Sequence, residues 1–279
     1  MSRRAALPTE LLPGARELLE LHARELPQRD DLCGAFCGAL ALGAAGFAAD
    51  ERGPLDQDAV GLAAGSIVSR EGARDPGTLP PGEAGRRDYR LALPSIDDAE
   101  VSGTTAAGVA RAIAELSHDV LAAIPLSGPW TVETLSGLFD VALESDRPLT
   151  LIANLATHHL WGSRPTPAQL LSHLYDGSSD GPAPDWDVGH FVCVLARTRG
   201  PRGALFTLAD TYPALGGHGV HLQPQDRLAA AIERRDKPAG GVIAVAFQAD
   251  AVRLREGADT LGLREALWDN GTVSAEQAA

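Results

Sequence analysis

Lysine and cysteine are both scarce in this sequence, which has one lysine and three cysteines among its 279 residues. Cys33 and Cys37 lie four residues apart and Cys193 stands far from both, so the chain lacks the disulfide framework of a small secreted domain. We therefore expect reduced thiols. Long hydrophobic runs are also absent, because the longest apolar stretch, GALALGAAGFAA, is too short to span a bilayer. No apolar segment follows the basic residues near the start. These absences predict a soluble, cytoplasmic protein with no membrane insertion.

Positive charge is the other shortage, since 24 lysine and arginine residues oppose 37 acidic residues and leave a formal net charge of −13. Binding to nucleic-acid phosphates requires a basic patch, and none of the arginine pairs extends into one. We therefore expect no nucleic-acid partner. A neutral or cationic substrate is compatible with this charge.

Apolar residues are abundant, because 44% of the chain is hydrophobic, which is enough to bury a large core. We expect a single domain over residues 27–265. An N-terminal helical extension, residues 1–26, precedes it, and a loose C-terminal tail, residues 266–279, follows it.

Helical patterns dominate the first part of the chain and strand patterns dominate the last part. Apolar residues at helical spacing or N-terminal capping signals predict helices over 9–26, 33–47, 56–68, 102–117, 130–145, 169–177 and 224–236. Compact β-like runs predict strands over 120–126, 148–155, 190–198, 204–211, 219–223 and 241–248, with antiparallel hairpins from residue 189 onward. This order predicts an α+β fold rather than alternating α/β units.

The segment around Cys33 has the features of a reactive thiol at the start of a helix. Residues 33–47 are almost wholly Ala, Gly, Leu, Cys and Phe, a composition typical of a helix buried on all sides. Asp30 or Asp31 is the natural N-cap of this helix. Cys33 then lies in the first turn, where unpaired backbone amides and the positive end of the helix dipole favour a thiolate.

A base and an orienting group follow Cys33 in the order that a cysteine nucleophile needs. His190 in DVGHFVCVLA can accept the thiol proton, and Asp210 in FTLADTYP can hold the imidazole in its productive tautomer. Gln28 in LPQRDDLCG can donate a hydrogen bond to an oxyanion. No other set of residues in the sequence offers a complete reaction mechanism.

These motifs resemble those of the papain-like cysteine peptidase superfamily, and most closely its branch of double-glycine leader peptidases of bacteriocin exporters and their stand-alone relatives. In that branch a glutamine precedes a Cys-Gly pair that opens a helix of small residues, as Gln28 precedes CGAFCGALAL here. A Gly-His then opens an apolar strand, and the next strand ends in aspartate, as in GHFVCVLA and LADTYP. The resemblance implies a papain-like fold, in which the helical half that carries the nucleophile packs on an antiparallel sheet half.

The chain departs from the pattern of that branch at two places. The gap between Gln28 and Cys33 is slightly shorter than usual, and Asp210 is followed by Thr211 and Tyr212 rather than directly by proline. We interpret the chain as a divergent stand-alone member whose substrate need not be a leader peptide.

Cys37 is an alternative nucleophile, because it is also followed by glycine and shares a helix face with Cys33. We favour Cys33, since Cys37 lies one turn inside the helix among apolar residues that raise a thiol pKa. We expect Cys193 to be a core residue. A zinc site is not expected, because the cysteine spacing fits no common zinc motif, and no cofactor is implied.

Several other side chains are candidates for the mouth of the cleft. We expect Trp161, Trp186 and Tyr212 to contact substrate. The adjacent pair His158 and His159 is expected in a loop near the cleft, and the two histidines of GGHGVH, 218 and 221, at the surface or behind the reacting residues.

The sequence therefore predicts cysteine-dependent acyl transfer on a peptide or amide substrate through a thioester on Cys33. Water as the acceptor makes the protein a peptidase or amidohydrolase. An amine makes it a transpeptidase, cyclase or amide synthase, an activity that papain-like folds also have in peptide natural-product maturation. The alternative is a non-catalytic accessory protein that binds peptides in the same cleft. The sequence leaves the substrate, the acceptor and the oligomeric state open.

Overall fold

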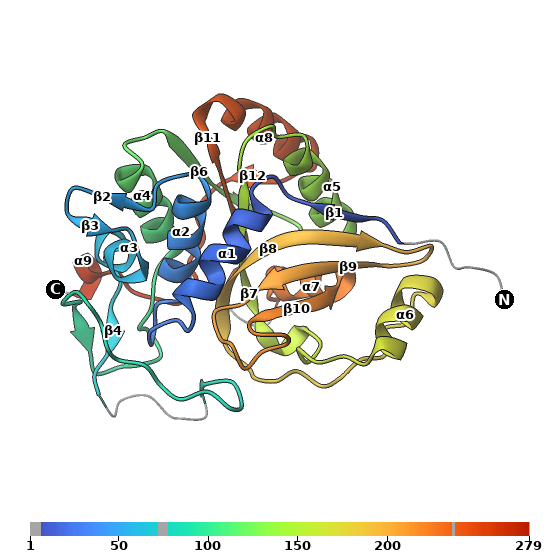
Figure 1. Cartoon of the computed structure of the whole chain (residues 1–279), viewed down its shortest axis with the longest axis horizontal. Coiled ribbons are helices and arrows are strands. Elements are labelled where there is room, and N and C mark those ends of the chain that lie inside the picture. The colour runs from blue at the N-terminus through green and yellow to red at the C-terminus, as the bar shows by residue number, and fades with distance from the viewer. Residues whose placement is uncertain (1–6, 72–77, 236–237, 279) are drawn as a thin grey trace.

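The computed structural model describes residues 7–71, 78–235 and 238–278, and an antiparallel β-sheet runs through its centre (Figure 1). The strand order in this sheet is β10-β9-β8-β7-β11-β6-β12, and β1 also pairs with β8. The strands are β1 (Thr9–Leu11), β6 (Leu121–Ser127), β7 (Thr150–Ala156), β8 (Gly189–Arg199), β9 (Ala204–Ala209), β10 (Val220–Pro224), β11 (Gly241–Phe247) and β12 (Arg264–Glu265). The predicted α+β class is confirmed, and the predicted hairpins from residue 189 are β8-β9 and β9-β10.

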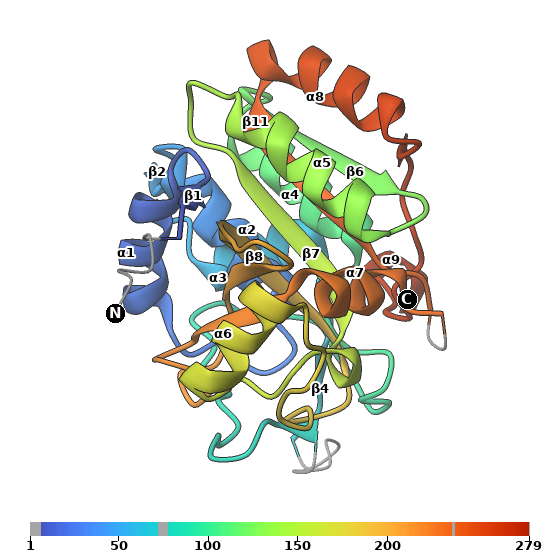
Figure 2. The same cartoon turned by 90° about the vertical axis from the view of Figure 1, so that its right-hand side faces the viewer.

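Helices cover both faces of the sheet. On one face, α2 (Cys33–Ala44) contacts β7 and β8, and α4 (Ala106–Leu116) contacts β6. On the other, α7 (Gln225–Glu233) contacts β7, β9, β10 and β11. Figure 2 shows α2 and α7 on opposite sides of β7, every residue of which is buried. The core therefore has two layers, one on each face of the central strands.

The remaining described elements lie around this centre. The other helices are α1 (Ala15–Glu25), α3 (Gln57–Ala64), α5 (Val132–Leu143), α6 (Pro167–Asp176), α8 (Gln248–Thr260) and α9 (Ala275–Ala278), with a 3-10 turn at Thr157–His159. Two small sheets pair β2 (Ala49–Asp50) with β3 (Gly53–Pro54) and β4 (Val68–Ser69) with β5 (Ser95–Ile96).

Local signals explain where these helices begin and end. The side chain of Asp56 accepts from Ala59 N–H at the start of α3, and that of Thr105 accepts from Gly108 N–H at the start of α4. α3 ends at Gly65, whose φ of 66° is the left-handed conformation that glycine adopts without strain.

Two parts of the chain differ from the sequence-based expectation. The predicted helix over residues 9–26 begins only at residue 15, because Gly14 turns the chain with φ 84° and residues 9–11 pair with β8 instead. No helix was predicted after β11, where α8 spans 13 residues. Its buried side is only Ala251, Leu254 and Ala258, which gives a weak apolar pattern.

The two flanking segments pack on the central part of the chain. In the N-terminal segment, Leu12 and Leu18 belong to the hydrophobic core. In the C-terminal segment, predicted to be a loose tail, Trp268 is buried and donates its indole N–H to Asn154 Oδ1 at 3.0 Å. Among the described residues, no helix combines the length and the apolarity needed to cross a membrane.

Candidate active site

Cys33 is the first residue of α2 and lies partly exposed at the wall of a pocket of about 830 Å³. α2 approaches its neighbours closely because it carries glycines where other helices would have side chains. A Cβ on Gly34 would lie 3.1 Å from side-chain carbons of both Thr104 and Val109 and 3.2 Å from Phe191. The small residues of the CGAFCGALAL segment therefore bring the start of α2 against β8, where His190 lies.

Neither predicted N-cap residue caps α2. The N-cap is Leu32, which makes no side-chain capping hydrogen bond. Asp31 has a left-handed backbone (φ 69°) and is buried, and its carboxylate accepts from the Ser69 N–H and hydroxyl, both at 2.8 Å, and from the Ser102 hydroxyl at 2.9 Å. Asp30 accepts from the Arg86 N–H at 3.0 Å. The two carboxylates therefore bond the segment before α2 to neighbouring loops. The N-terminus of α2 has no side-chain cap at Leu32.

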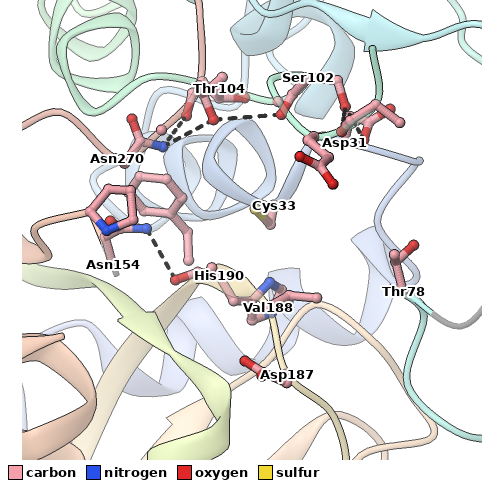
Figure 3. Close-up of a pocket in the computed structure, with 18 of the residues that line it drawn as sticks. Asp31, Cys33, Thr78, Ser102, Thr104, Asn154, Asp187, Val188, His190 and Asn270 are labelled. Atoms are coloured by element: carbon pink, nitrogen blue, oxygen red, sulfur yellow. Dashed lines mark hydrogen bonds between the residues drawn. The ribbon is translucent and has the colours of Figure 1, made fainter. Parts of the chain in front are cut away.

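His190 lies on the opposite wall of the same pocket, and Asp210 is buried behind it. His190 is the second residue of β8, Asp210 follows the last residue of β9, and both side chains are buried. His190 Nε2 lies 3.0 Å from Asp210 Oδ1. The Thr211 hydroxyl also lies 3.2 Å from Nε2, and the Cys33 side chain interacts with the imidazole as well. Figure 3 shows Cys33 facing His190 across the pocket.

The charges of His190 and Asp210 act strongly on each other. Burial alone would lower the pKa of His190, but the charge and hydrogen bond of Asp210, together with the Cys33 side chain, raise it to about 10. Burial alone would raise the pKa of Asp210, but the charge of His190 and the hydrogen bonds from His190 and His221 hold it well below its ordinary value. The pair therefore favours an imidazolium beside a carboxylate at neutral pH.

Asp210 is held by more than its bond to His190. Its Oδ1 also accepts from the Thr211 N–H at 2.7 Å, and its Oδ2 lies 3.1 Å from His221 Nε2. Its backbone carbonyl accepts from His22 Nε2, on α1. Burial lowers the pKa of His22, which keeps that imidazole neutral. The orientation of Asp210 is therefore determined by strands β8 and β10 and by helix α1.

Gln28 reaches the pocket despite its short spacing from Cys33, since both residues line it. The Gln28 N–H donates to the Thr211 carbonyl at 2.9 Å, and the Thr211 hydroxyl donates to Gln28 Oε1. This leaves the amide nitrogen of Gln28 as its donor end, with Arg29 O at 3.4 Å. Thr211, the residue after Asp210, therefore orients Gln28.

The three aromatic residues expected at the substrate divide into two groups. Trp186 and Tyr212 line the pocket and enclose His190, with ring centroids 4.9 Å and 6.3 Å from the imidazole. Trp161 does not line it; this residue is buried, and both its backbone N–H and its carbonyl bond the side chain of Gln223. Trp161 therefore lies behind the pocket, and its expected contact with substrate stays a prediction.

Cys37 and the paired histidines, His158 and His159, have other surroundings than Cys33 and His190. Burial, together with the neighbouring Cys193, raises the pKa of the Cys37 thiol well above its ordinary value. His158 Nδ1 lies 2.9 Å from Asp187, whose side chain lines the pocket, and His159 packs on His158. Among the described residues, no three His, Cys, Asp or Glu side chains cluster in a way that could hold a metal ion.

Three residues around the site, His22, Gln223 and Asn154, were not identified from the sequence as functional candidates. Of the two positions expected for His221, at the surface or behind the reacting residues, the second agrees with its 3.1 Å contact with Asp210. The Asn154 amide donates to the backbone carbonyl of His190 at 3.3 Å. His221 and Gln223 are two residues apart on β10, so their side chains point to the same face of the strand that pairs with β9, after which Asp210 lies. This spacing is the sequence signal that could have identified them.

A family model described as "Family of unknown function (DUF6885)" matches residues 12–269. The chain belongs to this family. A comparison with curated proteins finds no significant match. The region matched by the DUF6885 model includes the pocket residues Gln28, Cys33 and His190 and the buried pair Asp210 and His221 behind them.

Proposed function

We propose that this protein is a cysteine-dependent acyltransferase or hydrolase with a divergent papain-like fold, acting on a peptide or amide substrate. The observation that carries the proposal is the position of His190, which bonds Asp210 through Nε2 and interacts with the Cys33 side chain in the pocket that both residues line. A thiol, a base and an orienting carboxylate within one site are the parts that nucleophilic catalysis by cysteine requires.

In the proposed reaction, the thiol proton of Cys33 moves to His190 and leaves a thiolate beside an imidazolium. The raised pKa of His190 supports this distribution of charge at neutral pH. The thiolate attacks the carbonyl carbon of the substrate, and the carbonyl oxygen becomes an oxyanion that accepts from the Gln28 amide and the Cys33 N–H. His190 then gives its proton to the leaving amine as the C–N bond breaks, and a thioester remains on Cys33.

The thioester is resolved by an acceptor that attacks with His190 as base. Water gives a carboxylic acid, and an amine gives a new amide; in both cases the acceptor loses a proton and Cys33 regains one. The described lining of the pocket has the acidic side chains of Asp31, Asp97, Asp98, Glu100 and Asp187, and one arginine, Arg234. This charge disfavours an anionic substrate.

The experiment that tests the proposal is alkylation by iodoacetamide, because it needs no knowledge of the substrate. The wild-type protein is treated near pH 7, and the alkylated peptide is identified by mass spectrometry. We expect Cys33 to react faster than free cysteine and Cys33→Ala to show no fast labelling. Cys37→Ala is the matched control on the same helix and should label like wild type.

Two results would contradict the proposal. Fast labelling of Cys37 in Cys33→Ala would move the nucleophile one turn along α2. A Cys33 that reacts no faster than free cysteine would favour a peptide-binding accessory protein. For a reactive Cys33, fluorogenic peptide amides with and without an added primary amine then distinguish hydrolysis from amide formation.

A further inference from the structure

The carboxylate of Asp210 has a second buried partner besides His190. Its Oδ2 lies 3.1 Å from Nε2 of His221, on β10, while Oδ1 faces His190. His221 is 5% exposed and Asp210 2% exposed, so water does not readily replace either partner. A buried carboxylate between two imidazoles is more than a hydrolase triad requires. The protonation state of the second imidazole, His221, determines how much of the negative charge of Asp210 acts on His190.

Gln223 fixes that protonation state. Its Oε1 accepts from the Trp161 N–H and its Nε2 donates to the Trp161 carbonyl, both at 2.8 Å. Only one orientation of the amide satisfies this pair, because the backbone N–H needs the oxygen and the carbonyl needs the nitrogen. The amide nitrogen is therefore the atom that lies 3.0 Å from Nδ1 of His221.

The tautomer of His221 follows from donor and acceptor chemistry. An amide nitrogen only donates, so Nδ1 of His221 is the acceptor and carries no proton. The ring proton is then on Nε2, where it is donated to Asp210. His221 is accordingly a neutral donor, and Asp210 keeps its full negative charge for His190.

We propose that Gln223 and His221 are positioning residues, which hold Asp210 in one orientation and leave its negative charge to His190. The inference rests on the proposed function, since positioning matters only if His190 acts on Cys33. The titratable side chains around Asp210 include His190 on β8, His221 on β10, His22 on α1 and Cys37 on α2, with Cys33 on α2 acting on His190 and His218 acting on His22.

The first test measures the tautomer directly. In ¹⁵N-labelled wild-type protein near neutral pH, the imidazole nitrogen shifts of His221 should report a proton on Nε2 and none on Nδ1. A proton on Nδ1, alone or together with one on Nε2, would overturn the inference. This measurement does not depend on whether Cys33 is reactive.

The second test changes the tautomer through Gln223. In Gln223→Glu the new carboxylate can only accept a hydrogen bond at Nδ1, so it favours uptake of a second ring proton from solvent. His221 then becomes a cation that shares Asp210 with His190. The titration midpoint of His190, followed by NMR, should fall by about one pH unit or more. The control is His218→Asn, which removes an exposed imidazole from the neighbouring turn and should leave the midpoint unchanged. An unchanged midpoint in Gln223→Glu would also overturn the inference.

The third test removes and then restores the donor to Asp210. His221→Phe keeps a ring but cannot donate, and should slow Cys33 alkylation about 10- to 100-fold. His221→Gln, whose amide can donate to Oδ2, should recover most of the rate and show that the loss is not one of folding. If wild-type Cys33 is unreactive, the proposed function fails while the tautomer measurement still decides this inference. If Cys33 is reactive and His221→Phe reacts like wild type, the inference fails alone.

Discussion

The two sides of the site, the helical wall (α2) and the sheet wall (β8, β9 and β10 with the residues that follow β9), hold their side chains by different means. Cys33 is placed by packing: α2 is a helix of small residues pressed against its neighbours, with no side-chain cap at Leu32. His190 and Asp210 are placed by hydrogen bonds from Thr211, His221 and other polar side chains.

The difference indicates which property each wall controls. Shape complementarity fixes where the sulfur lies but leaves its protonation to the surroundings. A buried, fully bonded polar network fixes orientation and charge together, because each donor decides the state of the next acceptor. Changes on the sheet wall should therefore alter chemistry and pH dependence, and changes on the helical wall should mainly alter stability.

The largest effect should come from Asp210→Asn on the sheet wall. With either orientation of the new amide, the donors His221 Nε2 and Thr211 N–H cannot both find an acceptor, and the imidazole of His190 loses its charged partner. By analogy with other catalytic triads that lose their carboxylate, turnover should fall about 10³- to 10⁴-fold. The measurement is turnover of the best fluorogenic amide, with Cys33 alkylation beside it.

The same variant should move the pH dependence in a defined direction. Wild-type His190 stays protonated up to a pKa of about 10, so the stability it contributes is fully present below its ordinary pKa of 6.5 and is lost as pH rises through about 10. In Asp210→Asn the titration midpoint of His190 should fall towards its ordinary value. A midpoint that stays near the wild-type value would show that the sheet wall does not control charge as we argue.

A smaller effect is expected at Gln28, which lies between the two walls. Gln28→Ala removes the proposed side-chain donor to the oxyanion and should lower turnover about 10²- to 10³-fold with little change in Cys33 alkylation, because alkylation forms no oxyanion. Thr211→Val is the comparison, since it removes only the hydroxyl that orients Gln28. Equal losses of turnover and of alkylation in Gln28→Ala would instead assign Gln28 a role in holding the walls together.

The sequence predicted the walls better than the contacts between them. The run of small residues after Cys33 and the strand patterns around His190 and Asp210 were sufficient to predict a helix and a hairpin, because periodicity and composition are local properties. The N-cap prediction failed because Asp31 bonds Ser69 and Ser102, which are 38 and 71 residues away in sequence. Likewise, Trp161 reads as an exposed loop aromatic until its backbone contact with Gln223, 62 residues later, is known.

The smallest effect on chemistry, and the sharpest test of the helical wall, is expected from Gly38→Ala. A Cβ at this position would lie 2.9 Å from Cγ1 of Val60, so α2 and α3 must separate slightly. Overpacking typically costs about 1–3 kcal/mol, from which the better helix propensity of alanine recovers up to about 1 kcal/mol. With the full recovery, the free energy of unfolding, measured in denaturant, should fall by up to about 2 kcal/mol. The comparison is Gly217→Ala, where the nearest atom to a new Cβ is 3.8 Å away and no loss is expected. Cys33 alkylation in folded Gly38→Ala should remain at the wild-type rate, because the sheet wall is intact. A slower reaction would mean that the packing of α2 also controls the reactivity of Cys33. The two walls would then not act independently.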